Sequence, residues 1–247
     1  MRAPLVAPAR RVFELALGEM LWARRTAFMA LAVGAPILLA VVTRLAIVNG
    51  TAVLTINGSR IGSQAIFDTA VSVLYLRFIV PALGVFYGTS LIADEVEEKT
   101  ITYLFTRPIS RGAIVLGKYL AYLVGVAAVV LPSVALMFLI MVPFANMGIL
   151  FGKLLADLGV IALGLAAYGA VFLLAGVTFK RPLVGGLVFV FGWEPLALVL
   201  PGYLRHLTVA YYLQPASSSV AALVLIAAGA VLLAMRTIER REYVLEQ

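Results

Sequence analysis

The sequence predicts an all-α integral membrane protein with six transmembrane helices. Hydrophobic residues make up 63% of the 247 residues, charged residues only 13%, and the mean hydropathy is +1.07. A water-soluble domain needs more polar surface than this composition supplies. The apolar residues also form long uncharged runs, each close to the length that crosses ~30 Å of hydrocarbon as a helix. We therefore interpret residues 1–247 as a single transmembrane domain.

Composition also excludes several classes of function. The chain has no cysteine, which excludes disulfides, thiolate metal sites and cysteine nucleophiles. Its one histidine, His206, cannot form a metal cluster alone. The net charge of +7 is typical of a membrane protein with basic cytoplasmic loops. We therefore expect a lipid membrane around the chain, no nucleic-acid partner, no metal site and no catalytic residue.

Uncharged runs and the turn signals between them predict where the helices lie. An amphipathic pattern over 10–25 predicts an interfacial helix, with an extension of the first span as the alternative. Between the first two spans, two short strand-like runs, 51–56 and 59–61, flank the turn signal Asn57-Gly58, which predicts a small β-hairpin. The N-terminus lacks the pattern of a cleaved signal peptide. The predicted transmembrane helices are 27–48, 70–93, 111–142, 150–178, 182–200 and 217–236.

The distribution of basic residues predicts the orientation. Six spans place both termini on one side, together with the segments 94–118 and 180–182. This side carries most of the 19 Lys and Arg residues. Because cytoplasmic loops are enriched in Lys and Arg, we expect both termini in the cytoplasm. Few lysines, many alanines and arginines and the lack of cysteine favour the cytoplasmic (inner) membrane of a prokaryote.

The segment 94–118 is the longest charged stretch that can form regular structure. Its cluster of acids would occupy the first turn of a helix, where acids favour the positive end of the helix dipole. The helix continues through Leu104 and ends before Pro108, because the residue before a proline avoids the helical conformation. Ser110 can then cap the next span. The sequence predicts a helix over 94–110 with an apolar side that needs a partner surface, and an ordinary solvated loop is the alternative.

This segment carries a recognisable motif. It reads Glu95-Val-Glu-Glu-Lys-Thr-Ile-Thr-Tyr-Leu-Phe-Thr-Arg-Pro-Ile-Ser-Arg111, followed by Leu116-Gly-Lys118. The motif resembles the signature after the second membrane helix of ABC type-2 permeases, which are transmembrane subunits of ABC exporters with the type V fold. Lys99 stands where glycine is common in the family, and Ile101 replaces leucine. The six spans, the interfacial helix and the short link between helices 4 and 5 also fit, so the resemblance covers nearly the whole chain.

The resemblance implies a permease that works with a separate ATPase. In the family, the segment between helices 2 and 3 is a coupling helix that docks in a groove of the nucleotide-binding subunit. This chain has no Gly-x-x-x-x-Gly-Lys-Ser/Thr phosphate loop, so ATP and Mg would be bound by two copies of that cytoplasmic subunit. A second copy of this chain completes the expected dimer, and no cofactor is expected in the chain itself. The residues expected to contact the ATPase are Glu95, Glu98, Thr100, Leu104, Arg107 and Arg111, with Lys180 and Arg181 as a second, smaller contact.

Two charged residues lie inside predicted spans. Arg77 lies in helix 2 and Glu194 at a similar depth in helix 5. A lone charge at that depth costs at least ~2–3 kcal/mol. Three interpretations stay open: the two residues pair or line a polar cavity, Arg77 snorkels toward the outer surface, or the charges contact a substrate.

The outer side carries weaker signals. Four ring-bearing residues between helices 5 and 6 form either an interfacial belt or an exit gate: Tyr203, His206, Tyr211 and Tyr212. Lys153 and Asp157 are spaced as an ordinary helix pair. Glycines in helices 4 and 5 permit close helix contact and a dimer seam: Gly159, Gly164, Gly169, Gly185 and Gly186.

The sequence leaves three functional hypotheses. The first is a homodimeric ABC permease that exports an unidentified substrate. The second is a mechanotransmitting permease that acts on an extracytoplasmic accessory protein, as in copper-site maturation systems. The third is a non-ABC secondary carrier or an intramembrane enzyme, which is disfavoured because the spans hold no cluster of catalytic groups and the sequence shows no repeat. In the first two hypotheses the chain itself is not an enzyme.

Overall fold

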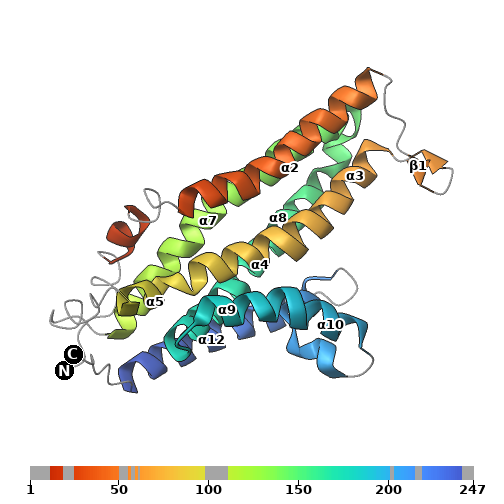
Figure 1. Ribbon diagram of the computed structural model, residues 1–247. Helices are drawn as coiled ribbons and strands as arrows, with labels where there is room; N and C mark the ends of the chain where they lie inside the picture. The colour runs from red at the N-terminus through yellow and green to blue at the C-terminus, as the bar shows by residue number, and fades with distance from the viewer. Residues whose placement is uncertain are drawn as a thin grey trace.

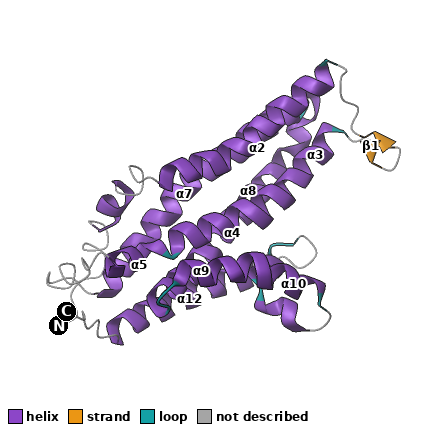
Figure 2. Cartoon of the chain, viewed as in Figure 1, coloured by secondary structure: helices purple, strands orange, loops and turns teal. Residues whose placement is uncertain are grey.

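The part of the chain that the structure describes is helical apart from one small hairpin and short connections (Figure 2). The computed structural model describes residues 12–18, 25–49, 55–56, 59–60, 62–97, 111–200, 203–214 and 219–240. Within this part of the chain, 6 helices are long and apolar enough to cross a membrane, which confirms the predicted all-α membrane class. These candidate spans are Met29–Val48, Ser63–Ala93, Arg111–Met141, Phe144–Thr178, Pro182–Val199 and Val220–Arg240.

The first span is helix α2 (Arg25–Val48), which continues through Pro36. Residues 12–18 form a short helix within the predicted interfacial segment, whose other parts before α2 lie outside the described residues. After α2, strands β1 (Thr55–Ile56) and β2 (Ser59–Arg60) pair antiparallel. This pairing confirms the hairpin predicted around Asn57-Gly58.

The second span is built from consecutive helical segments that form one rod. They are α3 (Ser63–Ala70), the π-helical η1 (Val71–Ile79), α4 (Val80–Leu83), the π-helical η2 (Gly84–Gly88) and α5 (Ser90–Glu97). The rod begins at Ser63 rather than at residue 70. The polar residues of α3 resemble a loop in sequence, but Phe67 is buried and its ring meets that of Phe138 edge-on at 5.5 Å.

The third and fourth spans are the longest helices. Helix α7 (Arg111–Met141) has 31 residues and α8 (Phe144–Thr178) has 35. Only Val142 and Pro143 connect them. Helix α8 therefore starts at Phe144 rather than at residue 150, because Pro143 adopts the extended conformation of an N-cap and the expected turn after it is already helical.

The last two spans are joined by folded segments. The fifth span consists of α9 (Pro182–Val188), the π-helical η3 (Phe189–Trp193) and α10 (Glu194–Val199). The 3-10 helix η4 (Tyr203–Leu207) and the short helix α11 (Val209–Tyr212) follow. Helix α12 (Val220–Arg240) is the sixth span and continues beyond the predicted end at residue 236.

The helices form an elongated bundle (Figure 1). Helices α2, α7, α8 and the α3–α5 rod run along one another, and α9, α10 and α12 lie against one side of this group. Arg111 hydrogen-bonds Ile238, Lys118 hydrogen-bonds Leu91, and Gly176 packs on Thr89, so α5, the start of α7, the end of α8 and the end of α12 share one end of the bundle. We call this the basic end, because it also carries Lys180, Arg181, Arg236 and Arg240.

Helix α8 is the centre of the bundle. It packs against α12, α7, α9 and successive segments of the second-span rod. Ile161, Leu165, Tyr168 and Leu173 on α8 have no exposed surface. The apolar core therefore follows α8 along its length, and the other spans are arranged around it.

Glycines set the distance between α8 and the second-span rod. A Cβ atom on Gly84 would lie 2.7 Å from the Cβ of Tyr168, and one on Gly88 would lie 2.9 Å from the Cβ of Phe172. On α8 itself, a Cβ on Gly176 would lie 2.6 Å from the carbonyl oxygen of Thr89. Such separations are too short for any larger residue, so the two helices meet through small residues, as is common in membranes.

The glycines considered for a dimer seam divide into two groups. Gly164, Gly169 and Gly186 are buried within the protomer, where a Cβ on Gly169 would overlap the ring of Tyr122. Gly159 and Gly185 have open space where a Cβ would stand. Internal packing therefore accounts for the first group, and only the second group is free for contact with another molecule.

Candidate functional site

The predicted coupling segment is described only at its two ends. Helix α5 begins at Ser90 and has no acid in its first turn, so Asp94 and Glu95 lie further along it. The prediction that these acids begin a new helix is wrong, because Thr89 is helical and the membrane helix continues into α5. Four residues expected to contact the ATPase lie outside the described residues: Glu98, Thr100, Leu104 and Arg107.

A buried lysine ties α7 to α5 at the basic end. Lys118 is 9% exposed, and its Nζ donates a hydrogen bond to the carbonyl oxygen of Leu91 at 2.9 Å. A buried ammonium group is costly unless hydrogen bonds compensate for its lost hydration. The bond therefore fixes the third span to the last turns of the second.

An arginine ties α7 to α12 at the same end. Nη1 of Arg111 donates to the carbonyl oxygen of Ile238 at 3.3 Å. Beside it, a Cβ on Gly112 would lie 2.9 Å from Cε of Met235, so the start of α7 lies directly on α12. The sequence assigned Arg111 to the ATPase contact, and the structure adds this intramolecular bond to the sixth span.

Lys180 and Arg181 lie in the short connection between α8 and α9. Both side chains are exposed at the basic end. Their predicted role as a second ATPase contact stays a prediction that this exposure permits.

Glu194 is a buried carboxylate that joins three elements. It begins α10 and is 3% exposed. Its Oε2 accepts a hydrogen bond from the hydroxyl of Tyr168 on α8 at 2.5 Å. Its Oε1 accepts from the backbone N–H groups of Val209 at 3.1 Å and Ala210 at 3.4 Å, at the start of α11. Both carboxylate oxygens are thus bonded.

Arg77 is not a partner of Glu194. It lies on an exposed side of η1, and in the described part of the chain Glu194 makes hydrogen bonds but no ion pair. The interpretation that Arg77 and Glu194 pair is therefore wrong. The sequence indicates that both residues lie at a similar depth in the membrane, but it does not show which face of its helix each residue occupies. The neighbouring Phe78 meets the ring of Phe191 at 5.7 Å. A polar cavity, snorkelling and substrate contact stay open for Arg77.

The four ring-bearing residues between the fifth and sixth spans do come together. The ring centroids of His206 and Tyr211 are 4.5 Å apart, those of Tyr211 and Tyr212 are 5.2 Å apart, and those of Tyr203 and His206 are 6.2 Å apart. The guanidinium of Arg205 lies 5.4 Å from the Tyr211 ring centre, a cation–π geometry. Their assignment as a gate stays a prediction.

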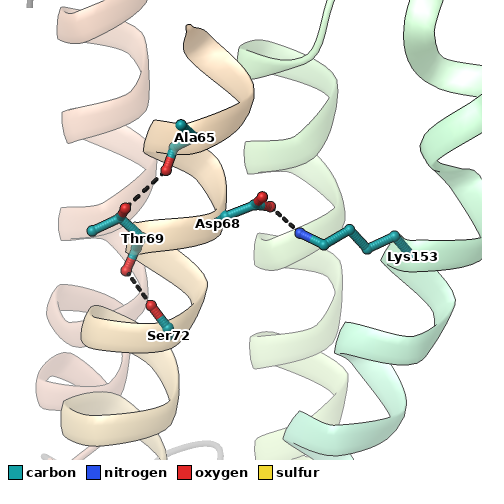
Figure 3. A network of polar contacts seen from close by, with 5 residues as sticks. All are labelled: Ala65, Asp68, Thr69, Ser72 and Lys153. Carbon is teal, nitrogen blue, oxygen red and sulfur yellow. Dashed lines mark hydrogen bonds and ion pairs between the residues drawn. The ribbon is translucent and has the colours of Figure 1, made fainter. Parts of the chain in front are cut away.

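An ion pair joins α3 to α8 at the end opposite the basic end (Figure 3). Nζ of Lys153 binds Oδ1 of Asp68, and the hydroxyls of Thr69 and Ser72 bond the α3 backbone nearby. The predicted partner of Lys153 was Asp157, whose Oδ2 is buried without a hydrogen bond in the described part of the chain. Sequence spacing finds partners within one helix and so misses Asp68.

Sequence reasoning also missed Tyr168 and the ties of Lys118 and Arg111. The available signal for Tyr168 was a hydroxyl in an otherwise apolar run, since a buried tyrosine usually requires a hydrogen-bond partner. The signal for Lys118 was a lysine at the start of a long span. Neither signal identifies the partner, because Glu194 and Leu91 lie on other helices.

The fold and these features define a multi-pass helical membrane protein with interhelical hydrogen bonds at its basic end. A family model described as "ABC-2 family transporter protein" matches residues 17–193. Because the match covers well over half of the 247 residues, the chain belongs to this family. It is a permease subunit of an ABC transporter, a membrane component whose family works with a separate ATP-binding subunit.

Family membership confirms the resemblance seen in the sequence. The matched residues include the motif between the second and third spans. The hypothesis of a non-ABC secondary carrier is therefore not retained. No curated protein matches the chain.

Proposed function

We propose that this chain is the membrane subunit of a homodimeric exporter, driven by two copies of a cytoplasmic ATPase that bind ATP and Mg. The observation that carries this proposal is the pair of ties beside the coupling segment. Lys118 bonds α5 on one side, and Arg111 bonds α12 on the other. Residues 98–110, which connect α5 to α7 in the sequence, are the part of the family motif that would receive the ATPase.

The ties give a mechanical route for coupling. A displacement of residues 98–110 by the ATPase acts directly on the end of α5 and the start of α7. Because Lys118 links these two helices, the second and third spans move together, and the Arg111 bond carries the displacement to α12. Close glycine contacts then pass movement of the second-span rod to α8. Packed helices transmit such displacements because their interfaces are dense rather than compliant.

The proposed orientation places the basic end in the cytoplasm of a prokaryotic cell, with both termini on that side and the hairpin outside. Lys180, Arg181, Arg236 and Arg240 at this end favour it under the positive-inside rule. The same orientation puts Glu95 and the exposed Lys180 and Arg181 on the side where ATP is available. Glu98, Thr100, Leu104 and Arg107 complete the proposed ATPase contact.

Co-purification tests the proposed function. The chain, tagged and co-expressed with the ABC-type ATPase encoded nearest to it, is expected to bring down that ATPase in equal amount. ATP hydrolysis by the reconstituted complex is expected to exceed that of the ATPase alone severalfold. A transmembrane control protein with the same tag should recover none. If the neighbouring ATPase neither binds nor changes its activity, the proposal is wrong.

A mechanotransmitting function is the second candidate, because the far end of α8 offers an exposed apolar surface. Helix α8 has 35 residues, well above the about 20 that span a bilayer. Its first residues lie beyond the Asp68–Lys153 ion pair, and there Phe144 is 89% exposed and Ile149 83% exposed. Such a surface can receive an extracytoplasmic accessory protein. Stable recovery of one such protein with the purified complex would favour this function over export.

A further inference from the structure

The segment Tyr203–Leu213, which we call the closing segment, has an exposed half and a buried half. All of η4, from Tyr203 to Leu207, is exposed. The residues that follow turn inward: Thr208 is 1% exposed, and Val209 and Leu213 are each 4% exposed. The side chain of Leu213 reaches α8, where its methyl carbons would lie 3.3 Å from a Cβ on Gly164. The closing segment thus inserts its second half into the helical bundle.

Glu194 is the group that holds the inserted half. The first N–H groups of a helix have no partner within it, and α11 begins with Val209 and Ala210. The Glu194 carboxylate accepts from both, while the hydroxyl of Thr208 accepts from Tyr211 at 3.3 Å. A buried polar group is costly unless it is hydrogen-bonded. In an apolar bundle these bonds offset the cost of burying both the carboxyl group and the inserted backbone.

Tyr168 secures the carboxylate from the opposite side. It lies on the central helix with no exposed surface, and its ring is stacked on that of Phe172 with 6.1 Å between the centroids. Its bond to Oε2 is independent of α11. If the closing segment moves outward, the carboxylate loses two donors and keeps this one.

We propose that Glu194 is the latch of an outer gate. Its bonds to Val209 and Ala210 hold the closing segment against α8, and Tyr168 positions the carboxylate so that the segment can be released and bound again. The claim that release of the segment accompanies transport rests on the proposed function. The claim that Glu194 holds the segment is independent of the proposed function.

Cysteine accessibility tests the latch directly, because the natural chain has no cysteine. The probe is a single cysteine, Val209→Cys, labelled with a polar maleimide in the intact chain in lipid nanodiscs. Glu194→Met retains the length of the side chain and removes both acceptors. We expect it to raise the labelling rate about tenfold, the effect of losing one to two net hydrogen bonds. Glu194→Gln keeps one oxygen for the N–H groups and should raise the rate less. Tyr168→Phe should fall between the wild type and Glu194→Met.

The control cysteine is Leu154→Cys, which is also buried but lies near the start of α8. Its labelling rate is expected to stay unchanged in Glu194→Met. A rise at both cysteines would mean that Glu194 merely stabilises the fold and would overturn the latch. Equal rates at Val209→Cys in wild type and Glu194→Met would overturn it as well. Methionine and glutamine fill volumes similar to that of glutamate. A lower labelling rate in Glu194→Gln than in Glu194→Met therefore cannot come from packing alone.

A second arm tests release during the ATPase cycle. In the complex with the ATP-binding subunit, Mg-ATP is expected to raise labelling of Val209→Cys and leave Leu154→Cys unchanged. If turnover proceeds without any change at Val209→Cys, Glu194 is a static brace and the gate is refuted. If no ATPase binds the chain, the proposed function fails, whereas the first arm still decides whether Glu194 holds the segment.

Discussion

At the scale of single residues, polar groups buried in this apolar bundle connect one helix to the next. Tyr119 donates to the carbonyl oxygen of Ala166 at 2.9 Å, and Tyr122 donates to that of Leu165 at 3.2 Å, both across the α7–α8 contact. The hydroxyls of Tyr75 and Ser133 are 3.0 Å apart and join η1 to α7. Hydrocarbon offers no alternative partner, so each group bonds protein and fixes the position of its helix.

Lys118 gives the most direct prediction at this scale. Lys118→Met keeps an apolar chain in the same space and removes the bond to Leu91. We expect the variant to insert and to bind the ATPase normally, because the bond lies inside the protomer. ATP hydrolysis that depends on the membrane subunit is expected to fall severalfold, since α5 and α7 no longer move together. The measurement is the ATPase rate of the reconstituted complex.

Lys118→Arg is the matched control, because arginine retains a donor at the same place. It should recover most of the activity that Lys118→Met loses. A Lys118→Met complex with undiminished coupled activity would show that the tie has no mechanical role.

At the scale of elements, the close contact between the second-span rod and α8 depends on small residues along the rod. Gly84 and Gly88 are four residues apart, so they lie on one face of the rod. A Cβ on Gly84 would meet the Cβ of Tyr168, and a Cβ on Gly88 would meet the Cβ of Phe172, both on α8. The two π-helical segments, η1 and η2, occur in this same rod. Such segments are rare and are frequent at functional sites. The rod thus combines an unusual backbone with a close glycine-mediated contact to α8.

Gly84→Val should separate these helices. The added side chain cannot fit 2.7 Å from a Cβ, so the contact must open or the backbone must shift. Overpacking of this kind costs about 1–3 kcal/mol, and we expect a lower melting temperature of the purified protein. Gly185→Val adds the same group where a Cβ meets nothing within 4 Å, and it should leave the melting temperature nearly unchanged. Equal effects of the two substitutions would contradict the packing account.

The sequence predicts the bounds of a helix well where charged residues or a proline flank a long apolar run. Helix α7 runs from Arg111 to Met141, against a predicted 111–142, because charges precede it and Pro143 follows it. The start of α3 was missed because its polar residues acquire their apolar environment only when Phe67 packs on Phe138. Local sequence cannot reveal a tertiary partner.

The residues of the candidate site also divide into those that the sequence groups together and those that only the fold brings together. The cluster of Tyr203, His206, Tyr211 and Tyr212 lies within ten residues of sequence and was predicted as a group. The contact of Tyr168, Glu194 and Val209 joins three separate elements, and only the folded structure brings it together. The pairing of Glu194 with Arg77, one of the three interpretations left open, is wrong, and the true partners were missed because backbone N–H groups, which nearly every residue carries, leave no mark in a sequence.

At the scale of the whole molecule, the two ends of the bundle differ in a way that fits a coupled permease. At the basic end, hydrogen bonds join α5, α7 and α12 around the residues that carry the family motif. Away from the basic end, between the fifth and sixth spans, the closing segment is held by a buried carboxylate beside the middle of α8, and further along the bundle the start of α8 is exposed. The closely packed α8 connects the two ends. In our account, the ATPase acts at the basic end, and the closing segment is released from Glu194 in response.

ATP hydrolysis by the complex with Leu104→Pro tests this account most directly. Proline in a helix interior costs about 3 kcal/mol relative to alanine and would break the predicted coupling helix over 94–110. Leu104→Ala removes the apolar side chain but keeps the helix, and it serves as the matched control. The account predicts that Leu104→Pro inserts into the membrane normally but loses membrane-subunit-dependent ATPase activity, whereas Leu104→Ala retains most of it. Full coupled activity in Leu104→Pro would contradict the assignment of this segment as the place where the ATPase acts.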